Sequence, residues 1–326
     1  MRRRSLLAAG ITVPLGLLTA LDDALASAPI PAAAEPADVA LYLSRARRLY
    51  DAGNPAALVA GLPQLLATAQ FRAEQTKDAV DYARSAACYD LATETLNKIG
   101  RLALSRITAD RSMTCARLSG LPIATAASAR CMSIVLRHEG REQIADRISL
   151  DAAVTLERTG LVTPAQAATY AQMLCTCAYA AAQAGDRDRA LEMIADAERA
   201  ATRLPESIRG QPFSVTPAHV ALYRVGVHWS LGDAGAAVSV GRRLHPGQFP
   251  TPERRGRLFT DLARAWWQWG KPEQTIQALL AAYRHAPAEV RDRPSIRNIV
   301  TDLARRHPNV SGVRELTAAA GLRAPR

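Results

Sequence analysis

The sequence predicts an all-α fold, a solenoid of about six antiparallel helix pairs, and three observations support this. Apolar residues recur every three or four positions, and no convincing alternating strand pattern appears. Alanine dominates the apolar 48% of the chain, which suits close helix packing better than sheets. Glycine recurs every 38 to 47 residues, where one helix would end and the next begin: Gly53, Gly100, Gly140, Gly185, Gly232 and Gly270.

Residues 1–36 are predicted to form a separate apolar segment and linker, with the solenoid occupying residues 37–326. Arginines at positions 2 to 4, an apolar stretch to Leu21 and small residues near Ala26 match an export signal of twin-Arg or Sec type. The acidic residues Asp22 and Asp23 argue against export. The alternative is an alanine-rich helical lead-in before a proline-containing linker. The stretch is too short and too interrupted to predict a membrane span.

Start signals accompany the predicted helices along the rest of the chain. A turn glycine allows the left-handed conformation that ends a helix, and a capping side chain or a first-turn proline then starts the next one. Such signals occur at Asn54-Pro55, Thr163-Pro164, Asp186, Thr216-Pro217, Asp233, Thr251-Pro252 and Lys271-Pro272.

The unit from Phe259 to Pro287 carries the most detailed repeat pattern. It contains Phe259, Leu262, Ala263, Trp266, Gly270, Thr275, Leu279, Ala282 and Pro287 in that order. This order resembles the tetratricopeptide repeat, although Thr275 stands where that repeat has a small alanine, and the first three units are degenerate. The resemblance implies a right-handed superhelix. An irregular all-α bundle is the alternative.

A second resemblance covers the C-terminal half more closely. The sequence letters are FSVTPAHVALYRV from residue 213, LGDAGAA from 231, FPTPERRGR from 249, LARAWWQWG from 262 and APAEVR from 286. They resemble the C-terminal part of actinobacterial Xre-type transcriptional regulators, in which a helix-turn-helix domain precedes a tetratricopeptide sensor region. No such domain precedes Arg2, so the resemblance implies a sensor or scaffold module. The alternative is a regulator whose DNA-binding domain is missing from this chain.

The net charge of +11 is carried almost entirely by arginine, since only Lys77, Lys98 and Lys271 are lysines. An excess of arginine and alanine is typical of a GC-rich genome, so we expect no direct DNA binding by this chain alone. Five cysteines without a C-x-x-C pair indicate small buried thiols, which favour the cytoplasm over an oxidising compartment. An exported location is the alternative.

No catalytic motif appears in the sequence. It lacks G-x-S-x-G, a Walker loop, G-x-G-x-x-G and a zincin histidine pair, and the acidic residues at helix starts are typical of caps. We therefore predict a non-enzymatic protein with no cofactor and no metal ligand.

Instead, the sequence predicts a ligand groove lined by the first helix of each pair. Residues three and four positions apart on one helix face would point into it. The candidates are Asp90, Glu94, Asn97, Arg130, Arg137, Tyr179, His219, Trp229, Arg264 and Trp267. This set has an acid and amide end, a basic middle and an aromatic end, and we expect it to hold an extended peptide or protein segment. A homodimer is a further possible association. An exported envelope scaffold is the alternative function.

Overall fold

The computed structural model describes residues 13–27, 36–204 and 215–322. Its described residues form sixteen α-helices and one short 3-10 helix, with no strand among them, which confirms the all-α prediction. The start at Arg2, residues 28–35 and the Phe213 that begins the second resemblance lie outside the described residues. No helix in the described part of the chain is long and apolar enough to cross a membrane.

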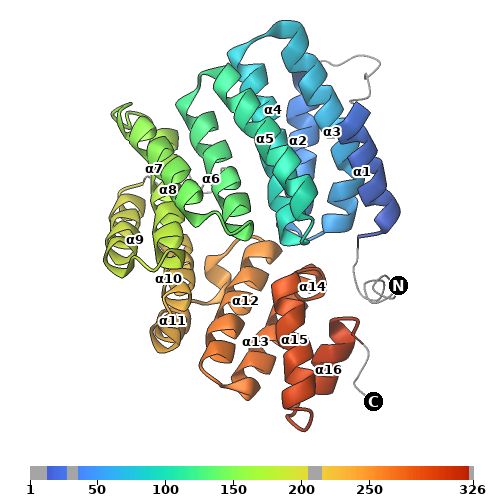
Figure 1. Ribbon diagram of the computed structural model, residues 1–326, viewed down its shortest axis with the longest axis vertical. Helices are drawn as coiled ribbons and strands as arrows, with labels where there is room; N and C mark the ends of the chain where they lie inside the picture. Colours follow the sequence, from blue (N-terminus) through green and yellow to red (C-terminus); the bar gives the residue numbers. More distant parts are fainter. Residues whose placement is uncertain (1–12, 28–35, 205–214, 323–326) are drawn as a thin grey trace.

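Six successive helix pairs make up most of the molecule (Figure 1). They are α2 Pro36–Asp51 with α3 Pro55–Thr76, α4 Ala79–Lys98 with α5 Leu102–Ser119, α6 Pro122–His138 with α7 Glu142–Glu157, α8 Pro164–Gln183 with α9 Arg187–Thr202, α10 Pro217–Ser230 with α11 Ala234–Gly241, and α12 Pro252–Gln268 with α13 Pro272–His285. The remaining elements are α1 Leu15–Ser27, the 3-10 helix Pro246–Gln248, α14 Pro287–Arg291, α15 Pro294–Arg306 and α16 Val313–Ala319.

The predicted helix boundaries are largely correct. Each of the six turn glycines has a positive φ, between 71° and 82°, and lies between the two helices of one pair. The side chains of Asn54, Thr163, Asp186, Thr216 and Thr251 accept the expected capping hydrogen bonds. Asp233 is an exception, because its carboxylate accepts a hydrogen bond from Arg187 at 2.6 Å and does not cap α11.

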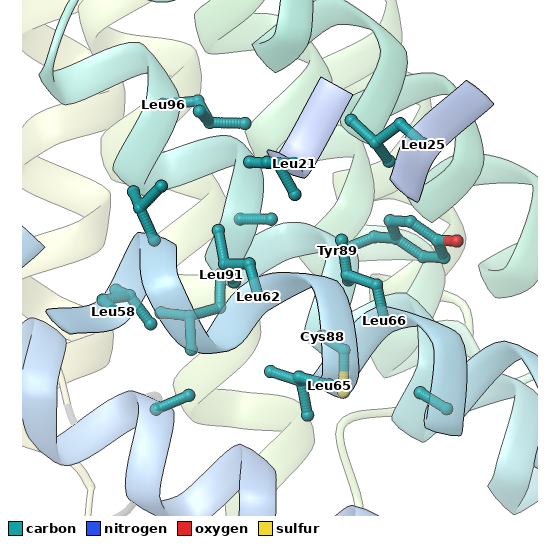
Figure 2. Close-up of a cluster of buried hydrophobic side chains, with 14 of the residues drawn as sticks. Leu21, Leu25, Leu58, Leu62, Leu65, Leu66, Cys88, Tyr89, Leu91 and Leu96 are labelled. Atoms are coloured by element: carbon teal, nitrogen blue, oxygen red, sulfur yellow. The ribbon is translucent and has the colours of Figure 1, made fainter. Parts of the chain in front are cut away.

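Helix α1 is part of the first hydrophobic cluster. Leu18, Leu21 and Leu25 recur at helical spacing and are buried, and Leu21 has no exposed surface. Figure 2 shows Leu21 and Leu25 in one cluster with leucines of α3 and with Tyr89 of α4. The helical core therefore extends ahead of residue 37, the expected start of the solenoid, because α1 presents an apolar stripe that the first pair buries. An export function of this segment stays a prediction.

The helix pairs follow a curve that brings the first pairs against the last ones (Figure 1). This contact is termed the seam, and its charged residues are Lys98, Glu253, Glu289 and Arg293. Lys98, at the end of α4, donates to Glu253 Oε1 at 2.5 Å, and its Nζ lies 2.6 Å from Glu289 Oε1. The curve thus closes on itself through buried ion pairs.

At the seam, the backbone of Gly100 also lies close to Pro294. Gly100 has a φ of 74° and lies against Pro294, where a Cβ on residue 100 would come within 2.5 Å of Pro294 Cγ. Only glycine therefore fits this position, both for its left-handed conformation and for its contact with the C-terminal helices.

Candidate functional site

A stripe of arginines from α6 and α12 meets two tyrosines from α8 and α10 on the inner side of the curve. The set is termed the inner arginine site and consists of Arg130, Arg137, Tyr179, Tyr223, Arg254 and Arg257. Arg130 and Arg137 lie seven positions apart on α6, and Arg254 and Arg257 lie three apart on α12, so each pair shares one helix face. Arg254 also lies near Tyr50 of α2 and Tyr223.

A small hollow that is open to solvent lies between α8, α10 and α12 within this site. It is lined by Tyr179, Leu222, Tyr223, Gly226, Arg254, Arg257 and Asp261. Gly226 is required here, because a Cβ would lie 2.6 Å from Cε2 of Tyr179. The tyrosine ring therefore packs directly on the backbone of α10 and forms one wall of the hollow.

The hydroxyl of Tyr223 is oriented by a neighbouring amide. Gln172 Nε2 donates a hydrogen bond to Tyr223 Oη at 2.9 Å, so this oxygen acts as an acceptor. A phenol also carries one proton to donate, and within the described residues no acceptor receives it. Tyr223 thus offers a hydrogen-bond donor beside the hollow.

Arg137 differs from the other arginines of the site, because no carboxylate in the described part of the chain forms an ion pair with it. Its guanidinium carbon lies 5.1 Å from the ring centroid of Tyr179, and Nη1 donates a long hydrogen bond of 3.4 Å to the Thr176 carbonyl. Burial lowers the pKa of Arg137, and the neighbouring charge of Arg130 lowers it further. Within the described residues, Arg137 is therefore a cation without an anionic partner.

The other charged residues predicted for the groove are paired within the protein. Glu94 forms ion pairs with Arg130 and, at 3.5 Å, with Arg47 of α2. The predicted acidic end is therefore neutralised, because arginines of the preceding and following pairs both reach Glu94. Arg264 lies 3.4 Å from Asp261 and donates to Ser295 Oγ at 2.7 Å. Burial and the charge of Arg293 lower the pKa of Arg264 to about 10.

Asp90 lies between three helices. Its carboxylate accepts hydrogen bonds from Ser112 of α5 at 2.5 Å and Ser128 of α6 at 3.2 Å. Burial raises its pKa to about 6, although these hydroxyls and Arg130 oppose the shift. Asn97 has a buried Oδ1 without a hydrogen-bond partner among the described residues.

The remaining predicted residues take part in packing. His219 is buried, its ring lies edge-on to Phe249 at 5.5 Å, and its Nδ1 lies 2.9 Å from the Thr216 hydroxyl. Burial lowers the pKa of His219 to about 3. Trp229 packs beneath the Arg264 guanidinium at 5.2 Å. Trp267 packs against the C-terminal hydrophobic cluster, edge-on to His307, while Trp266 stacks on Trp269.

Sequence reasoning missed Tyr223, Arg254, Arg257 and the seam residue Lys98. The charged residues Arg254, Arg257, Asp261 and Arg264 recur at intervals of three and four along α12, which was a usable signal for its inner face. On α10 the prediction chose His219 and Trp229 and did not include Tyr223. No local pattern indicated Lys98, since its partners lie on α12 and α14.

The comparisons with known proteins give no family. Neither a protein-family model nor a curated protein matches the chain. A solved structure, that of BtubC (BKLC) from P. vanneervenii, matches 76% of this chain and 90% of its own with 14% identity and a TM-score of 0.43. In the described part of the chain, no group of three or more His, Cys, Asp or Glu side chains is arranged to hold a metal ion.

Proposed function

We propose that this chain is a non-enzymatic helical-repeat protein that binds a peptide or protein segment on its inner face. The observation that carries the proposal is the inner arginine site. Side chains from three helix pairs line its hollow, and Arg137 has no anionic partner among the described residues. Arginine and tyrosine, together with tryptophan, are enriched among the few residues that dominate binding energy at protein interfaces. Rigid helices hold them, so little ordering is needed on binding.

The finer architecture is part of the same proposal. We infer that the six helix pairs are tetratricopeptide-like units in a right-handed superhelix, and that the chain acts as a sensor or scaffold of the kind found in Xre-type regulators. Support comes from the pattern of Phe259 to Pro287 and from the glycine turns within every pair. In this proposal the chain works through protein contacts in the cytoplasm.

Photo-crosslinking tests the location of binding. Ile134 lies between Arg130 and Arg137 on the inner face of α6, and it is replaced by a photoreactive phenylalanine analogue in the native host. The matched control carries the same analogue at Val162, which is 80% exposed in the turn after α7. We expect a discrete crosslinked segment from position 134 and none from position 162. Equal crosslinking at both positions, or crosslinking at 162 only, would contradict the proposal.

A further inference from the structure

We propose that the inner arginine site seats one anionic group, a carboxylate or a phosphate, of the bound segment. This inference rests on the proposed function and adds the chemical class of the ligand. Three features support it, namely the charge balance of the inner face, the donors around the hollow and the surroundings of Arg137.

The carboxylates of the inner face already have partners. Glu94 pairs with Arg47 and Arg130. Asp261 pairs with Arg257 and Arg264. Glu253 and Glu289 both pair with Lys98, and Glu253 also pairs with Arg254 and Glu289 with Arg293. Asp90 is held by two serine hydroxyls. Each of these arginines, and Lys98, forms an ion pair with a carboxylate. In the described part of the inner face, Arg137 forms no such pair. The site therefore has a positive charge to offer to a ligand.

The surroundings of Arg137 compensate its charge only weakly. A tyrosine ring and one long hydrogen bond to a carbonyl take the place of a counterion. Arg137 is partly removed from water. Partial removal of a cation from water without an ion pair costs free energy, and an incoming anion reduces this cost. Arginine also presents two parallel N–H groups, which match the two oxygens of a carboxylate or phosphate.

The Tyr179 ring, which Arg137 contacts, is one wall of the hollow, and four of the seven lining residues carry hydrogen-bond donors. Arg254 and Arg257 supply guanidinium groups, and the Tyr223 hydroxyl has a proton that no described acceptor takes. Asp261 also lines the hollow, but Arg257 lies 2.6 Å from it and offsets its charge. Leu222 is the one aliphatic side chain in the lining. An acidic group thus fits the hollow better than an apolar anchor does.

Calorimetry with defined probes tests the inference on the full chain. The probes are acetylated hexaglutamate, acetylated hexaglutamine, a hexapeptide with one phosphoserine, and inorganic phosphate, all at equal ionic strength. We expect the acidic peptides to bind and hexaglutamine not to bind. Arg137→Gln should weaken acidic binding at least tenfold, since a charge-assisted bidentate contact is lost. Tyr223→Phe, which keeps the ring, should weaken it about fivefold.

The matched control is Arg305→Gln, which removes an equal charge from an exposed arginine of α15. Its affinity should stay within twofold of the wild type. Arg137→Gln breaks no ion pair with a described carboxylate, so this variant should stay folded. Circular dichroism checks that it does. Tighter binding of the phosphoserine peptide than of hexaglutamate would assign the anion as a phosphate, and the reverse order would assign it as a carboxylate.

Failure of the inference and failure of the proposed function give different results. Equal binding of hexaglutamine and hexaglutamate, or no effect of Arg137→Gln on affinity, would overturn the proposal that the ligand group is anionic. Crosslinking at position 134 would still support binding of a segment in that case. Binding of phosphate that Arg137→Gln abolishes, together with no binding of any peptide, supports an anion site and overturns the peptide-binding function. Equal losses in Arg137→Gln and Arg305→Gln would show general charge attraction and overturn the specific site.

Discussion

Asp90 illustrates how one buried side chain ties several elements together. Its carboxylate on α4 accepts hydrogen bonds from hydroxyls on α5 and α6, so three helices of two successive pairs share one polar contact. Burial still outweighs these bonds and raises the pKa of Asp90 to about 6. The native state therefore holds a proton at a pH where the unfolded chain has already lost it.

This shift predicts how stability changes with pH. Between about pH 4 and pH 6 the native state binds more protons at Asp90, so the free energy of unfolding should fall as pH rises and level off above pH 6. Asp90→Asn removes the titration. The difference in free energy of unfolding between the wild type and the variant should change by on the order of 2 kcal/mol across this pH interval. Urea unfolding at several pH values measures it, and parallel profiles of the two proteins would refute the prediction.

Helix α1 shows what a tertiary contact adds to a segment whose local composition is ambiguous. An apolar stretch after basic residues suggested a signal or a helical lead-in, and the structure adds that the leucines at 18, 21 and 25 share a helix face and are buried. The first two pairs contribute the complementary surface, through leucines of α3 and Tyr89 of α4. The position of α1 thus depends on a tertiary contact that sequence periodicity alone did not reveal.

Burial of α1 gives a matched pair of substitutions. Leu21→Ala should lower the free energy of unfolding by about 2–5 kcal/mol, because Leu21 is fully buried. Leu15→Ala in the same helix should change it by less than about 0.5 kcal/mol, because Leu15 is 72% exposed. Urea unfolding of both variants checks this. Similar small effects at the two positions would mean that α1 does not contribute to the folded core in solution.

Prediction from the sequence succeeded best where signals are local. The turn glycines and most capping side chains fixed the helix pairs, since a left-handed residue or an N-cap acts within one turn of its own position. The predicted stripe of α6 includes Arg130 and Arg137 of the inner arginine site, and their role in binding stays a prediction. On α10 and α12 the choice of face followed the tryptophans, which the structure uses for packing, so Tyr223 and Arg254 were missed.

At the scale of the whole molecule the seam is the dominant feature. Lys98 and Glu253 lie 155 positions apart in the chain and are 2.5 Å apart in space. Burial would lower the pKa of Lys98, but Glu253 and Glu289 outweigh it and hold the pKa above its ordinary value. Such a pairing depends on the curvature of every intervening unit, which no local sequence signal specifies.

Removal of the lysine should weaken the seam selectively. Lys98→Met leaves Glu253 and Glu289 buried beside each other, with Arg254 and Arg293 as remaining partners. We expect a loss of about 3 kcal/mol in the free energy of unfolding, since an uncompensated buried charge is costly. The triple variant Lys98→Met, Glu253→Gln, Glu289→Gln should recover most of this loss. If the triple variant is as unstable as the single one, packing of the lysine stem accounts for its effect.

The seam contacts of Gly100 and Lys98 also affect the cooperativity of folding. In an open repeat array each unit contacts only its neighbours, so stability is nearly additive along one dimension and the ends fray independently. Here the end pairs share buried contacts, so unfolding at either end exposes charged groups of the other. Folding must bring distant segments together before these contacts form, which adds an entropic cost of loop closure and raises contact order. The molecule should therefore unfold as one cooperative block, and truncation from either end should destabilise the opposite end.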